Sequence, residues 1–115
     1  MDTIEFSWIK EFPAAITVCD VAGTIIEMND KSAKTFEKDG GYALIGRNMF
    51  ECHPDPARGK LERIMDARIK NVYTIEKNGV KKLIYQSPWY KDGICSGFVE
   101  MAFEIPINMP HFIRK

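Results

Sequence analysis

The sequence predicts an α+β domain: one five-stranded antiparallel sheet, helices on one face of it, and a flanking helix at the N-terminal end. Short β-branched segments lie near both ends of the sequence, with helical patterns between them. Two dipeptides typical of type I′ turns, Asn78-Gly79 and Asp92-Gly93, separate the last three of these segments. Two strands, several helices and then three strands form a sheet with its helices grouped on one side.

Length and composition favour a single domain. The chain has 115 residues, of which 45% are hydrophobic, enough for one core. We expect a flanking helix over residues 1–12, the sheet domain over residues 13–107 and a tail over residues 108–115.

Charge and targeting patterns exclude several partners. There are 16 basic and 16 acidic residues, so no basic surface for nucleic acid is expected. No apolar run approaches the roughly 20 residues of a membrane span, and the first ten residues lack a signal-peptide pattern. Cys19, Cys52 and Cys95 are far apart, which predicts reduced, buried thiols and no metal site. We therefore expect a cytoplasmic protein.

The first elements follow from spacing and turn residues. In residues 2–12, four apolar residues at helical spacing form a stripe, which Pro13 ends. Residues 14–21 and 24–28 form a hairpin around Ala22-Gly23. The stripe consists of Ile4, Trp8, Ile9 and Phe12.

The middle of the chain is predicted to be helical. Asn29-Asp30 caps a short helix over residues 31–36, and short helical turns follow Gly40-Gly41 over residues 42–52. Asp55-Pro56 combines a capping carboxylate with proline at the first helical position, which predicts a helix to about residue 70. Its inward residues are Leu61, Ile64, Met65 and Ile69.

The two tight turns predict the register of the last strands, which cover residues 72–77, 80–90 and 94–105. A two-residue loop at Asn78-Gly79 places Lys77 opposite Val80, Glu76 opposite Lys81 and Ile75 opposite Lys82. A two-residue loop at Asp92-Gly93 places Tyr90 opposite Cys95, Gln86 opposite Val99, Ile84 opposite Met101 and Lys81 opposite Glu104.

This register divides the side chains between two faces. The more apolar face is assigned to the core: Tyr73, Ile75, Ile84, Gln86, Cys95, Gly97, Val99, Met101 and Phe103. The other face holds Leu83, Tyr85, Ser87, Trp89, Phe98 and Glu100, and is too apolar for open water. We expect the N-terminal helix, of the same subunit or of a neighbour, to cover it.

The order of these motifs resembles the PAS family over residues 12–105. The matching motifs are Ile16 to Asp20 with Gly23, Ile25 and Asn29, the segment Leu44-Ile45-Gly46-Arg47-Asn48-Met49-Phe50, the long helix and the final three strands. The segment at residues 51–54 is similar to that of some bacterial PAS domains. The resemblance implies a sensory or dimerising module. Some PAS domains hold haem, flavin or a metabolite between helices and sheet, and others hold nothing.

Gln86 is the polar exception on the predicted core face. Burying its amide without a partner would cost about 1–3 kcal/mol, so it pairs either with backbone or with a ligand. If a ligand binds there, Gln86→Leu should weaken binding. The expected ligand-binding residues are Gln86, Ile84, Val99, Met101, Met49, Leu61, Ile64, Met65 and Tyr73.

Cofactor chemistry and catalysis are not predicted. Gly46-Arg47-Asn48-Met49 resembles the flavin motif of light-sensing PAS domains, but Met49 replaces their reactive cysteine. His53 precedes the long helix, whereas haem-binding PAS domains carry the ligand within it, so haem through His53 and flavin are only alternatives. The sequence shows no spacing typical of a nucleophile–base pair and no glycine-rich phosphate loop, so an enzyme is not expected.

The functional hypothesis is a sensory module in signal transduction that binds a small molecule between sheet and helices. The alternative is a ligand-free module used for dimerisation or for docking a signalling protein. A homodimer is expected in either case, through the N-terminal stripe and the outer sheet face. The expected interface residues are Ile4, Trp8, Ile9, Phe12, Leu83, Tyr85, Trp89 and Phe98.

Overall fold

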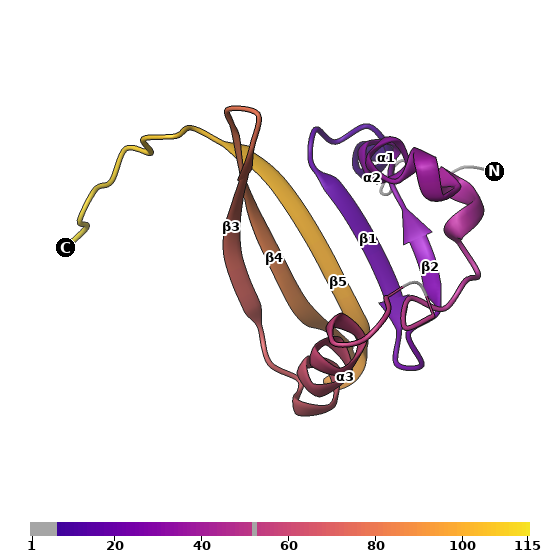
Figure 1. Ribbon diagram of the computed structural model, residues 1–115. Coiled ribbons are helices and arrows are strands. Elements are labelled where there is room, and N and C mark those ends of the chain that lie inside the picture. The colour runs from indigo at the N-terminus through magenta and orange to yellow at the C-terminus, as the bar shows by residue number, and fades with distance from the viewer. Residues whose placement is uncertain (1–6, 52) are drawn as a thin grey trace.

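A five-stranded antiparallel sheet forms the centre of the molecule, and the α+β prediction is confirmed (Figure 1). The computed structural model describes residues 7–51 and 53–115. The strand order is β2-β1-β5-β4-β3, so the first and the last strand in the sequence pair with each other at the centre of the sheet. The strands are β1 (Ala15–Asp20), β2 (Ile25–Met28), β3 (Asn71–Lys77), β4 (Val80–Lys91) and β5 (Ile94–Ile105).

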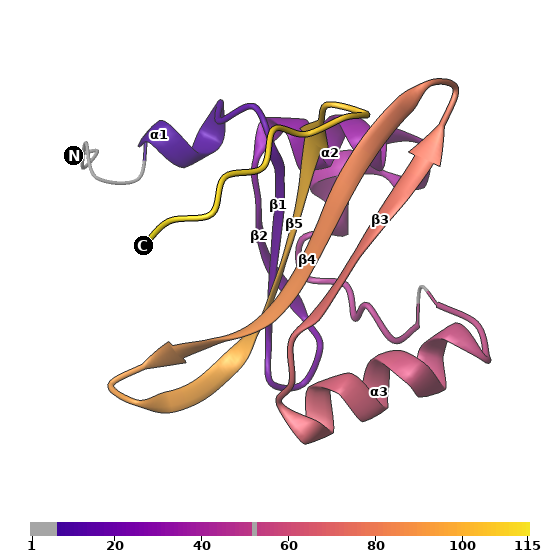
Figure 2. The same cartoon turned by 90° about the vertical axis from the view of Figure 1, so that its left-hand side faces the viewer.

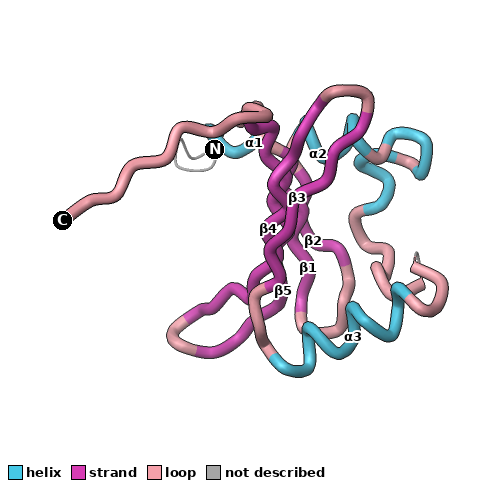
Figure 3. Tube along the Cα trace, turned by 60° about the vertical axis from the view of Figure 1, so that its left-hand side comes forward, coloured by secondary structure: helices cyan, strands magenta, loops and turns pink. Residues whose placement is uncertain are grey.

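The helices between β2 and β3 lie on one side of the sheet (Figures 2 and 3). On the other side lie the short helix α1 and the C-terminal tail, which has no helix or strand after Ile105. The helices are α1 (Ser7–Lys10), α2 (Asp30–Thr35), the 3₁₀ turns η2 (Glu37–Asp39) and η3 (Gly41–Leu44), and α3 (Ala57–Ala67).

Two of the three described residues of the N-terminal stripe are exposed. Trp8 is 60% exposed and Phe12 is 37% exposed, and their rings pack edge to face with centroids 5.7 Å apart. Ile9 is partly buried, and Ile4 lies outside the described residues.

The prediction for α3 is wrong at both ends. Pro56 is the N-cap residue rather than the first helical residue, and no side chain caps this end, so the carboxylate of Asp55 does not act as predicted. The helix ends at Ala67 because Arg68 adopts a left-handed conformation with φ of 53°, and its N–H bonds back to the last turn. Ile69 lies beyond this end and is 51% exposed, so it does not point inward.

The β3–β4 register is confirmed by the pairs Lys77–Val80, Glu76–Lys81 and Ile75–Lys82. Asn78 and Gly79 have φ of 53° and 78°, as a type I′ turn requires.

The β4–β5 register departs from the prediction by one residue. Tyr90 pairs with Cys95 as predicted, but Trp89 pairs with Gly97, so Ser96 is an extra residue in a β-bulge. Gly97 permits this with φ of 152°, and a side chain there would collide with the carbonyl oxygen of Cys19. The predicted pairs Gln86–Val99, Ile84–Met101 and Lys81–Glu104 are therefore wrong. Gln86 pairs with Glu100, Ile84 with Ala102 and Lys82 with Glu104.

The bulge exchanges the two faces of β5. Phe98, Glu100 and Ala102 lie on the helix side with Ile84 and Gln86. The opposite face is the outer-face patch, composed of Leu83, Tyr85, Trp89, Val99, Met101 and Phe103.

Two clusters form the core on the helix side of the sheet. Phe98 packs with Cys19, Ile64 and Met65 and is only 7% exposed, so it is not an outer-face residue as predicted. Ile25, Met28 and Leu44 form the second cluster.

Candidate ligand cavity

A cavity of about 720 Å³ lies between the inner face of the sheet and the helical segments. All five strands contribute to it, as do η3 and α3 and the loop between them. This volume is within the range of small-molecule sites. Its lining residues are Thr17, Cys19, Ile25, Met28, Phe36, Asp39, Leu44, Arg47, Met49, His53, Ala57, Lys60, Leu61, Ile64, Asn71, Tyr73, Gln86, Phe98, Val99 and Glu100.

A polar stripe crosses the sheet at this cavity. It consists of Thr17, Glu100, Gln86 and Asn71, which the register aligns across β1, β5, β4 and β3. The amide of Asn71 donates to Oε1 of Gln86 (2.9 Å), and Nε2 of Gln86 donates to Oε2 of Glu100 (2.9 Å). Because an ionised carboxylate only accepts, the orientation of the Gln86 amide is fixed.

The hydrogen bonds donated by Asn71 and Gln86 both point toward Glu100, whereas the hydroxyl of Thr17 bonds to that of Ser32. Neither of its carboxylate oxygens lies within 4 Å of a cationic group among the residues the structure describes, where the salt bridges are Lys10–Asp30, Lys31–Glu104 and Arg58–Glu62. Burial and then the charge of Glu100 raise the pKa of Tyr73, which borders the same cavity. Glu100 therefore borders the cavity without a charged partner among the described residues.

Apolar side chains from the helices, β1, β2 and β5 form most of the rest of the lining, and most of them belong to the two core clusters. The exposed residues Asp39, Arg47, His53 and Lys60 also border the cavity. Burial raises the pKa of the Cys19 thiol, so it lines the cavity as a neutral group. A mostly apolar lining with one polar stripe suits a molecule that has both an apolar body and a polar group.

The predicted binding residues fall into three groups. Gln86, Tyr73, Met49, Leu61 and Ile64 border the cavity. Ile84 and Met65 are buried on the helix side, and Met65 borders a smaller hollow of about 220 Å³ beside Phe50.

Val99 and Met101 form the third group, because the bulge turns their side chains to the outer face of the sheet. Val99 borders the cavity between Phe98 and Glu100, although alternation turns its side chain to the outer face. Met101 pairs with Tyr85 on that face.

Sequence reasoning missed Glu100, Asn71 and Thr17. A count from the Asp92-Gly93 turn that leaves out the bulge places Glu100 on the outer face, whereas the bulge turns it to the helix side. A glycine inside a strand often marks a bulge, so Gly97 was the available signal.

Comparison with known proteins finds solved structures of the same shape. The PAS domain of an HTR-like protein from Haloarcula marismortui matches with a TM-score of 0.60 and 15% identity, covering 86% of this chain and 87% of that one. The PAS domain of Bordetella pertussis BvgS matches at 0.63 and 20% identity, covering 85% and 81%.

The chain has a PAS fold.

A third structure, the Vibrio cholerae Aer2 receptor, described as a dual PAS-haem oxygen sensor, matches this PAS domain with a TM-score of 0.62 and 15% identity. The match covers 81% of this chain and 95% of that one. No protein-family model matches the sequence, and no curated protein matches it.

His53 and Met49 both border the cavity of this PAS fold. His53 is exposed, and its Nδ1 lies 2.7 Å from the carbonyl oxygen of Met49, so it makes a loop contact. Across residues 7–51 and 53–115, no group of three or more His, Cys, Asp or Glu side chains could hold a metal ion.

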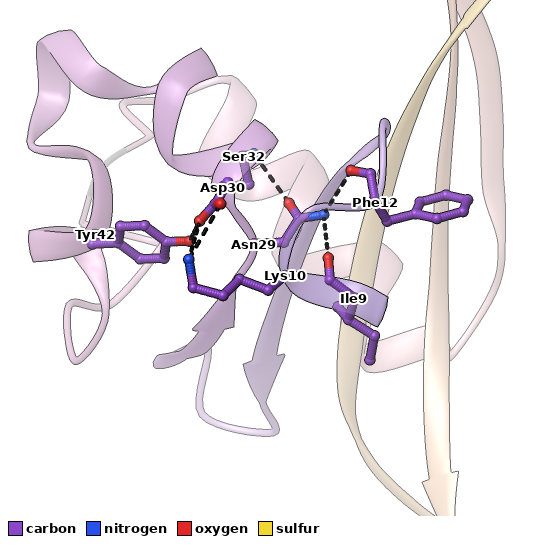
Figure 4. Close-up of polar contacts among 7 residues, drawn as sticks. All are labelled: Ile9, Lys10, Phe12, Asn29, Asp30, Ser32 and Tyr42. Carbon is purple, nitrogen blue, oxygen red and sulfur yellow. Dashed lines mark hydrogen bonds and ion pairs between the residues drawn. The ribbon is translucent and has the colours of Figure 1, made fainter. Parts of the chain in front are cut away.

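Asn29 links β1 and α2 to α1 (Figure 4). Its Oδ1 accepts from the backbone N–H groups of Ile16 and Ser32, at 2.9 and 3.1 Å. Its Nδ2 donates to the carbonyls of Ala14 and Ile9, at 2.8 and 3.1 Å. At 1% exposure, this amide joins β1, α2 and α1 at one point.

A second link lies beside it on the surface (Figure 4). Lys10 of α1 forms a salt bridge of 3.1 Å with Asp30 of α2, which also accepts from the hydroxyl of Tyr42 in η3. These hydrogen bonds lower the pKa of Asp30, and the bond to Asp30 raises the pKa of Tyr42 to about 12.

The outer-face patch of the PAS fold is partly exposed. Trp89 is anchored within it, because its Nε1–H donates to the carbonyl of Cys19 (3.0 Å). Among residues 7–51 and 53–115, no helix is long and apolar enough to cross a membrane.

Proposed function

We propose that this chain is a sensory module of signal transduction that binds a small molecule in the cavity between the sheet and the helices. The observation that supports it is the cavity itself, about 720 Å³ with an apolar lining and a polar stripe. A purely structural core would be expected to close such a space, because interiors are close-packed. A non-enzymatic, cytoplasmic role is part of the proposal.

The similar structures support a sensory role through the fold. Aer2 is described as a haem oxygen sensor. Here Met49 lacks a thiol that could add to flavin, and the Nδ1 of His53 contacts a backbone carbonyl at the rim. The proposed ligand is therefore a small molecule without a visible chromophore.

The signal would travel from the cavity to α1. Phe36 and Leu44, at the ends of α2 and η3, border the cavity. Asn29 and the Lys10–Asp30–Tyr42 group join the same two elements to α1. A ligand that displaces α2 and η3 would displace α1 with them.

Native mass spectrometry of the purified protein tests the proposal. The expected spectrum contains a species heavier than the chain by the mass of a small organic molecule. Met49→Trp should remove that species by filling the cavity, whereas Met109→Trp, on the exposed tail, should retain it. A purified protein that neither carries nor takes up any small molecule from a metabolite extract would contradict the proposal.

The second candidate is a ligand-free module for dimerisation or partner docking. The outer-face patch favours it, because partly exposed apolar side chains from two strands lie together there. A homodimer through this patch and the Trp8–Phe12 pair is compatible with either candidate, so the mass spectrum and not the oligomeric state separates the two.

A further inference from the structure

We propose that the ligand of this cavity carries a protonated amine, bound by the carboxylate of Glu100, on a largely apolar body. This inference rests on the proposed function and names the chemical class of its ligand. The supporting observations are the unpaired charge, the direction of the stripe's hydrogen bonds and the composition of the lining.

The hydrogen bonds hold Glu100 in place and, among the described residues, leave one of its carboxylate oxygens free to accept. Gln86 occupies Oε2, and Asn71 in turn fixes Gln86. Oε1 of Glu100 makes no hydrogen bond to any residue that the structure describes. A group that binds there must donate a proton, and an ammonium group has three N–H donors.

Desolvation favours a cation over a neutral donor. An apolar molecule that fills the cavity removes water from around Glu100. A carboxylate without water or a counter-charge is costly to bury, whereas a paired one with its hydrogen bonds made is tolerated. An alcohol could donate one hydrogen bond but would leave the charge uncompensated.

The protein's own cations do not fulfil this role. Arg47 and Lys60 border the cavity, but both are exposed, and neither is within salt-bridge distance of Glu100. Lys31 lies 3.9 Å from Glu104, four residues further along β5.

Isothermal titration calorimetry at pH 7 with three probes of similar size tests the class. The probes are phenethylamine, 2-phenylethanol and 3-phenylpropionate, of which the first is protonated at this pH because alkylamines have a pKa near 10.4. Phenethylamine should bind roughly ten times more tightly than 2-phenylethanol, or better, and 3-phenylpropionate should bind most weakly.

Glu100→Gln is the decisive variant, because it keeps the shape and a hydrogen-bonding partner for Gln86 but removes the charge. It should lose most of the preference for the amine, with affinity falling roughly tenfold to a hundredfold, while affinity for the alcohol changes little. Glu104→Gln, on the same strand and face but outside the cavity, is the matched control and should behave as wild type.

The outcomes separate this inference from the proposed function. Binding of the alcohol or the acid with equal or higher affinity than the amine overturns the inference and leaves a small-molecule site. Retention of amine preference in Glu100→Gln also overturns it. A failure of all three probes to bind up to millimolar concentration overturns the inference, and a failure to detect any molecule by mass spectrometry overturns the proposed function.

Discussion

Asn29 shows how one side chain can hold three segments together. Asn29 caps α2 and also joins the loop before β1 to the start of the sheet, because its side-chain amide both donates and accepts hydrogen bonds. The sequence predicted the cap from the residue type. It could not predict the contacts with Ile9 and Ala14, since these depend on how the chain before β1 folds back.

Asn29→Ala should lower the free energy of unfolding by roughly 2–4 kcal/mol, because it leaves several buried backbone groups without partners. Asn29→Asp should also destabilise, since a carboxylate cannot donate to the carbonyls of Ile9 and Ala14. Urea denaturation measures both. Asn108→Ala, on the exposed tail, should change stability by less than about 0.5 kcal/mol, and an equal effect at the two sites would contradict this account.

The Tyr42–Asp30 hydrogen bond should make the stability of the folded state depend on pH. The pKa of Asp30 is lowered in the folded state, so its stabilising effect is present above the ordinary value of 3.8 and is lost as pH falls through the folded pKa. The pKa of Tyr42 is raised from 10.0 to about 12, so its contribution is full below about 10 and disappears as pH rises through 12.

Tyr42→Phe should therefore raise the pKa of Asp30 toward its ordinary value, measured by NMR titration of the carboxyl carbon. It should also remove the tyrosine that ionises near pH 12 from the ultraviolet titration. Tyr90→Phe, at an exposed position, is the control and should leave Asp30 unchanged. An unchanged Asp30 in Tyr42→Phe would show that the hydrogen bond is absent in solution.

At the scale of elements, turns were predictable and the bulge was not. Asn78-Gly79 sets its register locally, because two consecutive residues with positive φ allow few alternatives. The bulge at Ser96 depends on contacts between distant segments: Gly97 lies against the carbonyl of Cys19 and the ring of Trp89. Counting from the turn alone therefore exchanged the faces of β5 and hid Glu100 from the predicted site.

Gly97→Ala should destabilise the domain by roughly 3 kcal/mol or more, because an ideal Cβ would lie 1.9 Å from the carbonyl oxygen of Cys19. Gly79→Ala provides the comparison. It meets no atom within 4 Å and should cost only about 1–2 kcal/mol for its positive φ. Thermal or urea denaturation that gives equal losses for the two variants would argue against the bulge.

At the scale of the whole molecule, the layer arrangement was predictable from the order of elements, and the cavity residues only in part. Leu61, Ile64 and Met49 border the cavity as expected from helix spacing and the resemblance, whereas Met65 borders the smaller hollow. The stripe required the correct register of four strands. The exposure of Trp8 and the partial exposure of the outer-face patch leave open a surface that a second copy can cover.

We expect the wild-type protein to sediment as a dimer at tens of micromolar, roughly the range of a weak dimer. Trp8→Glu and Trp89→Glu should shift it to monomer. Because Trp89 also bonds to Cys19, Tyr85→Glu should be included as an outer-face variant without that bond. Ile69→Glu, on an exposed residue after α3, is the control. A monomeric wild type at this concentration would exclude the homodimer.

The purified protein should show no Soret band and no light-sensitive flavin spectrum, because Met49 has no thiol and His53 contacts a backbone carbonyl at the rim. Visible absorption spectroscopy of the protein as isolated, and after incubation with haem or flavin mononucleotide, is the measurement. A Soret band that disappears in His53→Ala would instead support the haem alternative.

The central claim, that the cavity binds a small molecule, is tested most directly by NMR chemical-shift mapping with the metabolite extract used for mass spectrometry. We expect the side-chain amide signals of Gln86 and Asn71 to move, together with backbone signals of residues that line the cavity. The variant Met49→Trp should abolish these changes. Signals that do not move with the extract, or that move only on the outer-face patch, would contradict the claim.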